Sequence, residues 1–158
     1  MRRQLLAGLA AGATGTAALN VITYLDMALR GRPSSTVPAQ VAERMAEKGG
    51  IALDKGLEPG EQVDNRKEGT GALLGYLTGL GMGLGYGVVR MGLARPPRLV
   101  AGVFLGLAAM AGSDVPATAL GVADPGSWSA SSWASDLVPH LAYGVVTASV
   151  FEALVEAS

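Results

Sequence analysis

Long stretches without charge alternate with short charged segments along this chain, and the pattern predicts helices that cross a membrane. The first uncharged stretch runs over 21 residues from Leu5 to Leu25, and a second one of 21 residues runs from Gly69 to Val89. At about 1.5 Å per helical residue, each is roughly 30 Å long and matches the hydrocarbon thickness of a bilayer. A soluble core does not readily explain two such stretches within 158 residues.

Turn and charge signals divide the rest of the chain in the same way. Arg30 to Pro33 end the first span, and Pro139 falls in the first turn of a fourth span that begins near Asp136. We therefore predict an all-α integral membrane bundle of about four transmembrane helices, a single domain over 1–158. The predicted spans are 5–29, 69–89, 99–122 and 136–155, and the predicted extramembrane loop is 30–68.

Two of these spans carry a second signal. In the third, Asp114 can cap a new helix that has Pro116 in its first turn, so a break is expected near 113–116. In the first, Arg2 and Arg3 precede an Ala/Gly/Leu stretch as in a secretory signal. That stretch is longer than the roughly 7 to 15 apolar residues of a signal, and other spans follow, so it is assigned to a membrane helix.

The first loop contains a short amphipathic pattern. A helix start at Thr36 is followed by Val37, Val41 and Met45 at intervals of four, and Gly49-Gly50 ends the pattern. This predicts a short helix that lies on the bilayer surface or over the bundle. The polar residues after it predict a flexible linker that reaches to the second span.

Glycine recurs at every fourth position of the second span. Residues four apart share a helix face, so these glycines form a groove without side chains. Helices in lipid associate by close backbone approach, which small residues allow. This GxxxG pattern, a glycine zipper, predicts packing within the chain, with a homo-oligomer interface or a pore lining as alternatives. The glycines are Gly71, Gly75, Gly79, Gly83 and Gly87.

Polar side chains within the spans predict a cluster inside the bundle. Asp136, His140 and Tyr143 share one face of the fourth span. An ionised carboxylate at the bilayer centre costs about 2.5 to 3.5 kcal/mol, so such groups face protein or water. The cluster is either a hydrogen-bonded structural feature or a site that handles protons or a solute. Its candidate members are Asn20, Thr23, Asp26, Asp114, Asp136, His140 and Tyr143.

Composition narrows the classes of function. A net charge of −1 argues against a nucleic-acid partner. The chain has no cysteine and a single histidine, His140, so neither thiol chemistry nor a self-contained zinc site is indicated. A Gly-x-Gly-x-x-Gly pattern within residues 79–87 follows no strand and does not indicate a dinucleotide site. No catalytic motif frames the polar residues, so no cofactor and no enzymatic reaction are expected.

Aromatic and basic residues bear on membrane placement. Trp128 and Trp133 lie in a serine-rich segment and are expected at the membrane–water boundary. The first loop has seven lysines and arginines, whereas the N-terminal segment and the second loop have five together. Those two segments are short and free of acids, which favours an orientation with both termini in the cytoplasm.

One further set of residues carries a family resemblance: Gly15 to Asn20, Thr23 to Met27, Arg30 to Ser34, Trp128, Trp133, Asp136, Pro139-His140 and Tyr143-Gly144. These segments resemble short membrane proteins of actinobacterial type and, more loosely, the YagU-like inner-membrane family. The resemblance implies a bacterial inner membrane, and it supplies no cofactor to carry over because the family has no assigned reaction.

We therefore expect a non-enzymatic membrane protein with an accessory, assembly or stress-related role and with the lipid bilayer as its partner. The alternative is a small proton-linked transporter or permease that works through Asp26, Asp114 and His140. The sequence indicates no particular small-molecule substrate.

Overall fold

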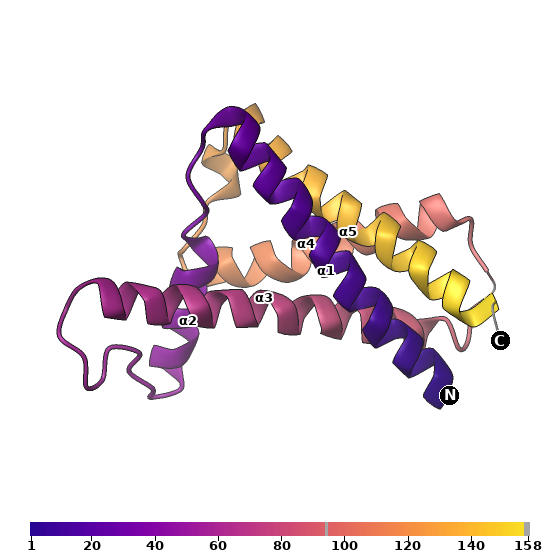
Figure 1. Cartoon of the computed structure of the whole chain (residues 1–158), viewed down its shortest axis with the longest axis horizontal. Helices are drawn as coiled ribbons and strands as arrows, with labels where there is room; N and C mark the ends of the chain where they lie inside the picture. Colours follow the sequence, from indigo (N-terminus) through magenta and orange to yellow (C-terminus); the bar gives the residue numbers. More distant parts are fainter. Residues whose placement is uncertain (94, 157–158) are drawn as a thin grey trace.

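The computed structural model, which describes residues 1–93 and 95–156, is all-helical over those residues. Four of the helices are long and apolar enough to cross a membrane, which confirms the predicted fold class. A short helix, α2, lies in the first loop as predicted. The elements are α1 (Arg2–Arg30), α2 (Val37–Lys48), α3 (Glu61–Val89), α4 (Arg98–Ala119), the 3-10 turn η1 (Pro125–Ser127) and α5 (Ala130–Glu156) (Figure 1).

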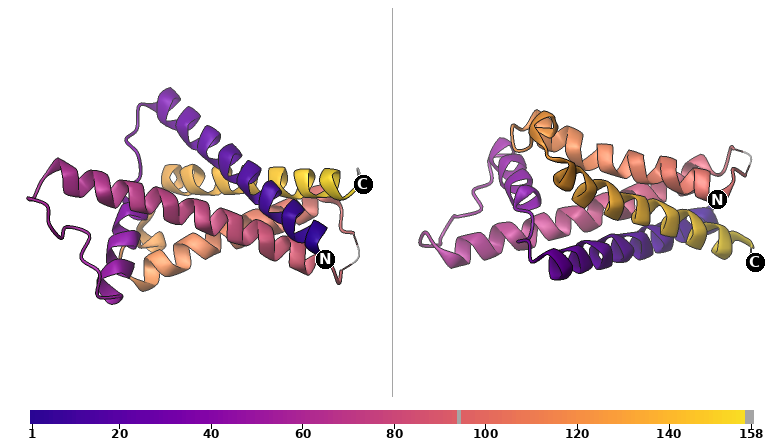
Figure 2. Two further views of the ribbon diagram at one scale, coloured as in Figure 1. Left: turned by 60° about the horizontal axis from the view of Figure 1, so that its bottom comes forward. Right: turned by 90° about the horizontal axis from the view of Figure 1, so that it is seen from above.

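Helix α5 occupies the centre of the bundle. It packs against α1 on one side and α4 on the other, and α1 also packs against α3. The two chain ends and the α3–α4 connection lie at one end of the molecule, whereas the α1–α3 and α4–α5 connections lie at the other (Figures 1 and 2). The chain thus reverses direction from each long helix to the next, as a four-pass membrane protein requires.

The long helix α3 begins eight residues before the predicted span, at Glu61 instead of Gly69. Residues 61–68 were expected to be linker, and this expectation is wrong. Glu61 and Asp64 lie in the first turn, where negative charges interact favourably with the helix dipole and the unpaired N–H groups. A polar extension of α3 therefore continues beyond the apolar part.

The expected break in the third span near 113–116 is absent, because α4 is one continuous helix. Pro116 lies in the final turn, where it removes only one backbone hydrogen bond. The Ser113 hydroxyl donates to the Met110 carbonyl at 2.9 Å, in the turn before the proline. The helix ends before Gly121, which has a φ of 70°, and not at residue 122.

The fourth span also begins earlier than expected, at Ala130 instead of Asp136. Ser129 explains the difference, because its hydroxyl accepts a hydrogen bond from the Ser132 N–H at 3.1 Å, as in a helix N-cap. Pro139 therefore lies inside α5 and not in its first turn.

Helix α2 packs against α3. Val41 and Ala42 form its buried face. The backbone at Pro38 and Ala39 lies directly against Gly71 of α3.

Candidate functional site

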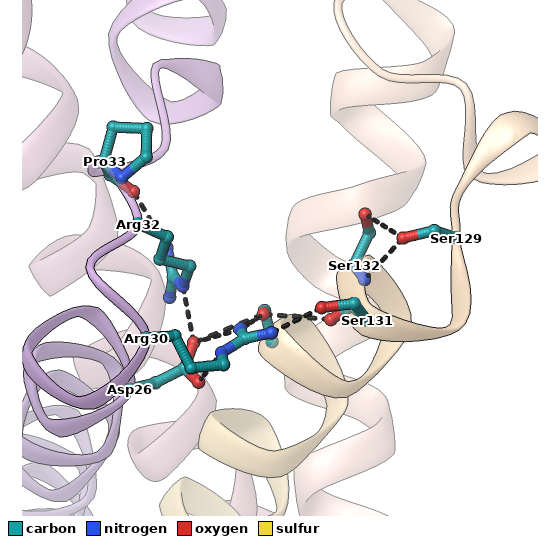
Figure 3. Close-up of polar contacts among 8 residues, drawn as sticks. Asp26, Arg30, Arg32, Pro33, Ser129, Ser131 and Ser132 are labelled. Carbon is teal, nitrogen blue, oxygen red and sulfur yellow. Dashed lines mark hydrogen bonds and ion pairs between the residues drawn. The ribbon is translucent and has the colours of Figure 1, made fainter.

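The polar side chains of the bundle form three separate groups, and each group includes residues of α5. The first, which we call the α1–α5 clamp, joins the end of α1 to the start of α5 (Figure 3). The Asp26 carboxylate lies 2.5 Å from the Nε atoms of both Arg30 and Arg32. Arg30 in turn donates to the hydroxyls of Ser131 and Ser135. Asp26 is therefore neutralised here by two arginines.

The second group, the α4–α5 cluster, consists of Ser113, Asp114, Asp136 and His140. His140 places its Nε2 atom 3.3 Å from the Ser113 hydroxyl and its Nδ1 atom 2.8 Å from the Asp136 carbonyl oxygen. The same Nδ1 atom lies 3.3 Å from the Asp136 carboxylate. Asp114 is close enough to interact electrostatically with both Asp136 and His140.

This cluster has the chemistry of a proton-binding site. Two carboxylates and an imidazole meet between two apolar helices, where the dielectric constant is low and charges interact strongly. The Asp114 and Asp136 side chains are close enough for a protonated carboxyl of one to donate to the other. Among the described residues, no group of three histidine, cysteine or acidic side chains is arranged to hold a metal ion.

The other predicted cluster members lie elsewhere. The Tyr143 hydroxyl donates to the Gly79 carbonyl of α3 at 2.6 Å, in the centre of the bundle. The Asn20 amide lies 3.4 Å from the Tyr76 hydroxyl, and Thr23 is half-buried on α1. The structure thus brings Asp114, Asp136 and His140 together, and it separates them from Asp26, Asn20 and Tyr143.

The glycines of α3 differ in what they contact. A Cβ atom on Gly83 would overlap the backbone of Gly8 and Gly12 in α1, and one on Gly87 would lie 2.6 Å from the Gln4 carbonyl oxygen. Gly79 faces the side chain of Thr16. Gly71 contacts α2, as described above, whereas a Cβ atom on Gly75 would meet no neighbouring group within 4 Å.

A similar close contact joins α4 to α5. A Cβ atom on Gly106 would lie 2.6 Å from the His140 carbonyl oxygen, and one on Gly144 would overlap the backbone of Gly102 and Gly106. The backbones of the two helices that carry the α4–α5 cluster are therefore held at short range.

The third group, the α3–α5 ion pair, was not anticipated from the sequence. Arg90 Nε lies 2.9 Å from Glu152 Oε1, and the two side chains are only 6% and 3% exposed. Burial lowers the pKa of Arg90, but the hydrogen bond and charge of Glu152 outweigh it and raise the pKa overall, so the guanidinium stays charged. Glu156, one turn further on, pairs with Arg95 and Arg98 at the surface.

The sequence does contain a signal for this group. Glu152 and Glu156 are the only acids of the last span beyond His140, and they are four residues apart on one helix face. The second loop carries three arginines and no acid. Charge complementarity between that loop and the end of α5 would have predicted the contact.

The two tryptophans form a pair at the start of α5. Their rings are in an edge-to-face arrangement with centroids 5.1 Å apart. Trp128 is half-buried and Trp133 is exposed.

No family model, curated protein or solved structure matches this chain.

Proposed function

We propose that the chain is a multi-pass membrane protein whose role is non-enzymatic, as an accessory or assembly component of a bacterial inner membrane with both termini in the cytoplasm. The observation that carries this proposal is the glycine-lined contact between apolar helices, α1 with α3 and α4 with α5. Close backbone approach is how helices associate in lipid, where apolar burial gives no driving force. The α3 glycines then act as a glycine zipper within one chain.

Large apolar side chains on the outside of the bundle support the same proposal. Leu6, Leu73, Leu77 and Phe104 are each about two-thirds exposed in the absence of lipid. In water this surface would drive aggregation, whereas a bilayer covers it.

The test compares two glycines of α3 that the sequence pattern does not distinguish. Gly79→Leu should destabilise the bundle by about 1 to 3 kcal/mol, because the new side chain meets Thr16 and Tyr143. Gly75→Leu is the matched control, since nothing lies within 4 Å of that position. Denaturant titration of both variants in detergent micelles measures the difference. Equal stabilities would contradict intramolecular packing through Gly79, and recovery of the unaltered chain as a monomer in plain buffer would contradict membrane insertion.

A second function, proton-linked transport of a small solute, is favoured by the α4–α5 cluster. Two carboxylates and a histidine between membrane helices are costly to bury, and such groups commonly mark proton or solute pathways. The Asp114 and Asp136 carboxyl groups also contact each other, so one proton can be shared between them beside the imidazole.

Proteoliposomes that contain a pH-sensitive dye test this second function. The unaltered protein should dissipate an imposed pH gradient faster than empty liposomes, and His140→Ala should abolish the difference. Arg44→Ala, on the exposed face of α2, is the control that should retain the flux. Absence of flux from the unaltered protein would exclude proton-linked transport.

A further inference from the structure

Two arginines at the start of α1 have no acidic partner. The three arginines between the end of α3 and the start of α4 each pair with a glutamate of α5. Arg2 and Arg3 are exposed, and within the described residues neither forms an ion pair with a carboxylate. The first turn of α1 contains no acid, and no side chain caps its N–H groups. Positive charge and unpaired N–H groups therefore meet at this end of the helix.

The last turn of α5 holds Arg3 in place. The Nη2 atom of Arg3 donates to the carbonyl oxygen of Leu154 at 3.1 Å and also to that of Val155. Carbonyl groups in the last turn of a helix have no partner within that helix, and a cation interacts favourably with them. The contact joins the start of α1 to the end of α5, two segments that lie at the same end of the molecule (Figures 1 and 2). The Nε and Nη1 atoms of Arg3 form no hydrogen bond to another described residue.

An open groove begins beside these arginines. Its volume is about 540 Å³, which lies within the range of roughly 300 to 1,000 Å³ that is usual for ligand sites. Apart from the two arginines, its lining is apolar. We call it the α1–α5 groove, and it is lined by Arg2, Arg3, Leu6, Ala7, Ala10 and Leu154.

The polar and apolar parts of the α1–α5 groove follow each other along α1. Arg3 and Ala10 are seven residues apart, or roughly 10 Å at the rise of an α-helix. When the arginines lie at the level of the lipid headgroups, the apolar part of the groove lies in the outer hydrocarbon region of the bilayer. Leu6 and Leu154 are 66% and 42% exposed in the absence of lipid. Both side chains are therefore accessible to an acyl chain.

We propose that the α1–α5 groove binds one anionic phospholipid, with its phosphate on Arg2 and Arg3 and one acyl chain against Leu6, Ala10 and Leu154. The planar guanidinium matches the oxygen atoms of a phosphate, and the N–H groups at a helix start favour the same anion. A zwitterionic lipid offers a similar acyl chain but has no net charge to balance the two arginines. The inference deepens the first proposed function, on whose membrane insertion it rests, by naming a partner.

Native mass spectrometry of the full chain tests the headgroup. The chain is released from detergent micelles that contain equal amounts of phosphatidylglycerol and phosphatidylcholine, and it should retain one phosphatidylglycerol molecule in preference. Each arginine near anionic lipid contributes about fivefold in affinity, so the double variant Arg2→Gln/Arg3→Gln should lose about 25-fold. The matched control is Arg95→Gln/Arg98→Gln, which removes two arginines from the same end but outside the groove and should keep the preference.

The same measurement tests the acyl chain. Ala10→Phe places a ring in the α1–α5 groove and should weaken phosphatidylglycerol binding, although the charge of the protein is unchanged. Ala17→Phe is the control, at an exposed alanine two turns further along α1 and outside the groove. An excess of inorganic phosphate at constant ionic strength should not displace the lipid, because phosphate has no acyl chain. Circular dichroism and size-exclusion profiles establish that each variant is folded.

Several results would overturn the proposed lipid site. Equal retention of the two lipids by the unaltered chain, or equal losses in the two double variants, would show that the groove does not select the anionic lipid. Displacement by inorganic phosphate, or unchanged binding in Ala10→Phe, would show an anion site without an acyl chain. A dimer that retains no lipid would assign the groove to a second copy of the chain.

The outcomes also separate this inference from the function on which it rests. Loss of the lipid preference, with Gly79→Leu still less stable than Gly75→Leu, would overturn the lipid site and leave the packed membrane bundle. A retained preference with equal stabilities of those two variants would keep the lipid site and overturn packing through Gly79. Recovery of the unaltered chain as a monomer in plain buffer would overturn both.

Discussion

Two glutamates of α5, one turn apart, show how strongly position decides what a charged residue does. Glu152 is buried against Arg90, whereas Glu156 is 41% exposed and pairs with Arg95 and Arg98 at the surface. Desolvation is the difference between them. When a buried ion pair loses one partner, the remaining charge is left uncompensated. When an exposed ion pair loses one partner, water solvates the remaining charge.

We therefore expect the same substitution at the two glutamates to have unequal effects. Glu152→Gln should lower the free energy of unfolding by about 3 kcal/mol, because the Arg90 guanidinium loses its counter-charge in a buried site. Glu156→Gln should cost less than about 1 kcal/mol. Denaturant titrations in the same detergent give both values. Equal losses would contradict the burial of the Arg90–Glu152 pair.

Tyr143 offers a second test at this scale. Tyr143→Phe removes the hydrogen bond to the Gly79 carbonyl, which joins α5 to α3. The expected loss of stability is about 1 kcal/mol, since that carbonyl is also a helix acceptor and interhelical hydrogen bonds in membranes are modest. Tyr24→Phe, at a tyrosine that is 63% exposed, is the control. Matching thermal midpoints for the two variants would argue against the bond.

The membership of the polar groups could be predicted only in part. Helical periodicity places Asp136, His140 and Tyr143 on one face of α5, but His140 contacts Ser113 of α4 whereas Tyr143 donates to the Gly79 carbonyl of α3. Periodicity within one helix does not say which other helix supplies the neighbours. Asp26 was grouped with His140, but Arg30 and Arg32 are close in sequence and bind its carboxylate first.

Helix boundaries depend on single capping residues, which hydropathy does not detect. Ser129 caps the start of α5 about two turns before the apolar stretch of that helix. Acidic residues after Gly60 favour a start of α3 before the apolar stretch of α3. Pro116 produced the opposite error, because a proline in a last turn removes too little bonding to break a helix. The apolar lengths predicted the existence of the spans, whereas the Ser129 hydroxyl of α5 and the acidic first turn of α3 favour their earlier starts.

The docking of α2 on α3 leads to a prediction for that pair of elements. A Cβ atom on Gly71 would lie 2.6 Å from the backbone of Pro38 and Ala39, so Gly71→Leu should displace α2. Trypsin should then cleave faster after Arg44 and Lys48, which lie in α2. Gly69→Leu is the matched control, because nothing lies within 4 Å of that glycine. Unchanged cleavage in the Gly71 variant would contradict the contact.

Charge is distributed unevenly between the two ends of the whole molecule. The end with both termini carries five arginines and two glutamates among its charged side chains, and one of the arginines is Arg90, which is paired with Glu152. Most of the other basic residues lie toward the opposite end among more numerous acids. This arrangement supports the proposed orientation, because anionic lipids of a cytoplasmic leaflet attract a basic surface.

The absence of cysteine makes this orientation directly measurable. Ser34→Cys lies in the α1–α2 loop and Gly92→Cys in the α3–α4 loop, and both positions are exposed. With cytoplasmic termini, a membrane-impermeant maleimide added to intact cells should label Ser34→Cys only. Labelling of Gly92→Cys alone would reverse the orientation, and labelling of both would contradict the four-pass fold.

The central position of α5 has a consequence for biosynthesis. Helices α3 and α4 follow each other in the chain but touch over a small area, whereas α1 and α4 each find their main partner in α5, which is synthesised after both of them. During insertion, α1, α3 and α4 therefore remain incompletely packed until the α5 neighbours of Asp114 and Arg90 have been synthesised. Chains that are truncated before α5 should be degraded, because they lack the α5 side chains that neutralise Arg90 and contact Asp114.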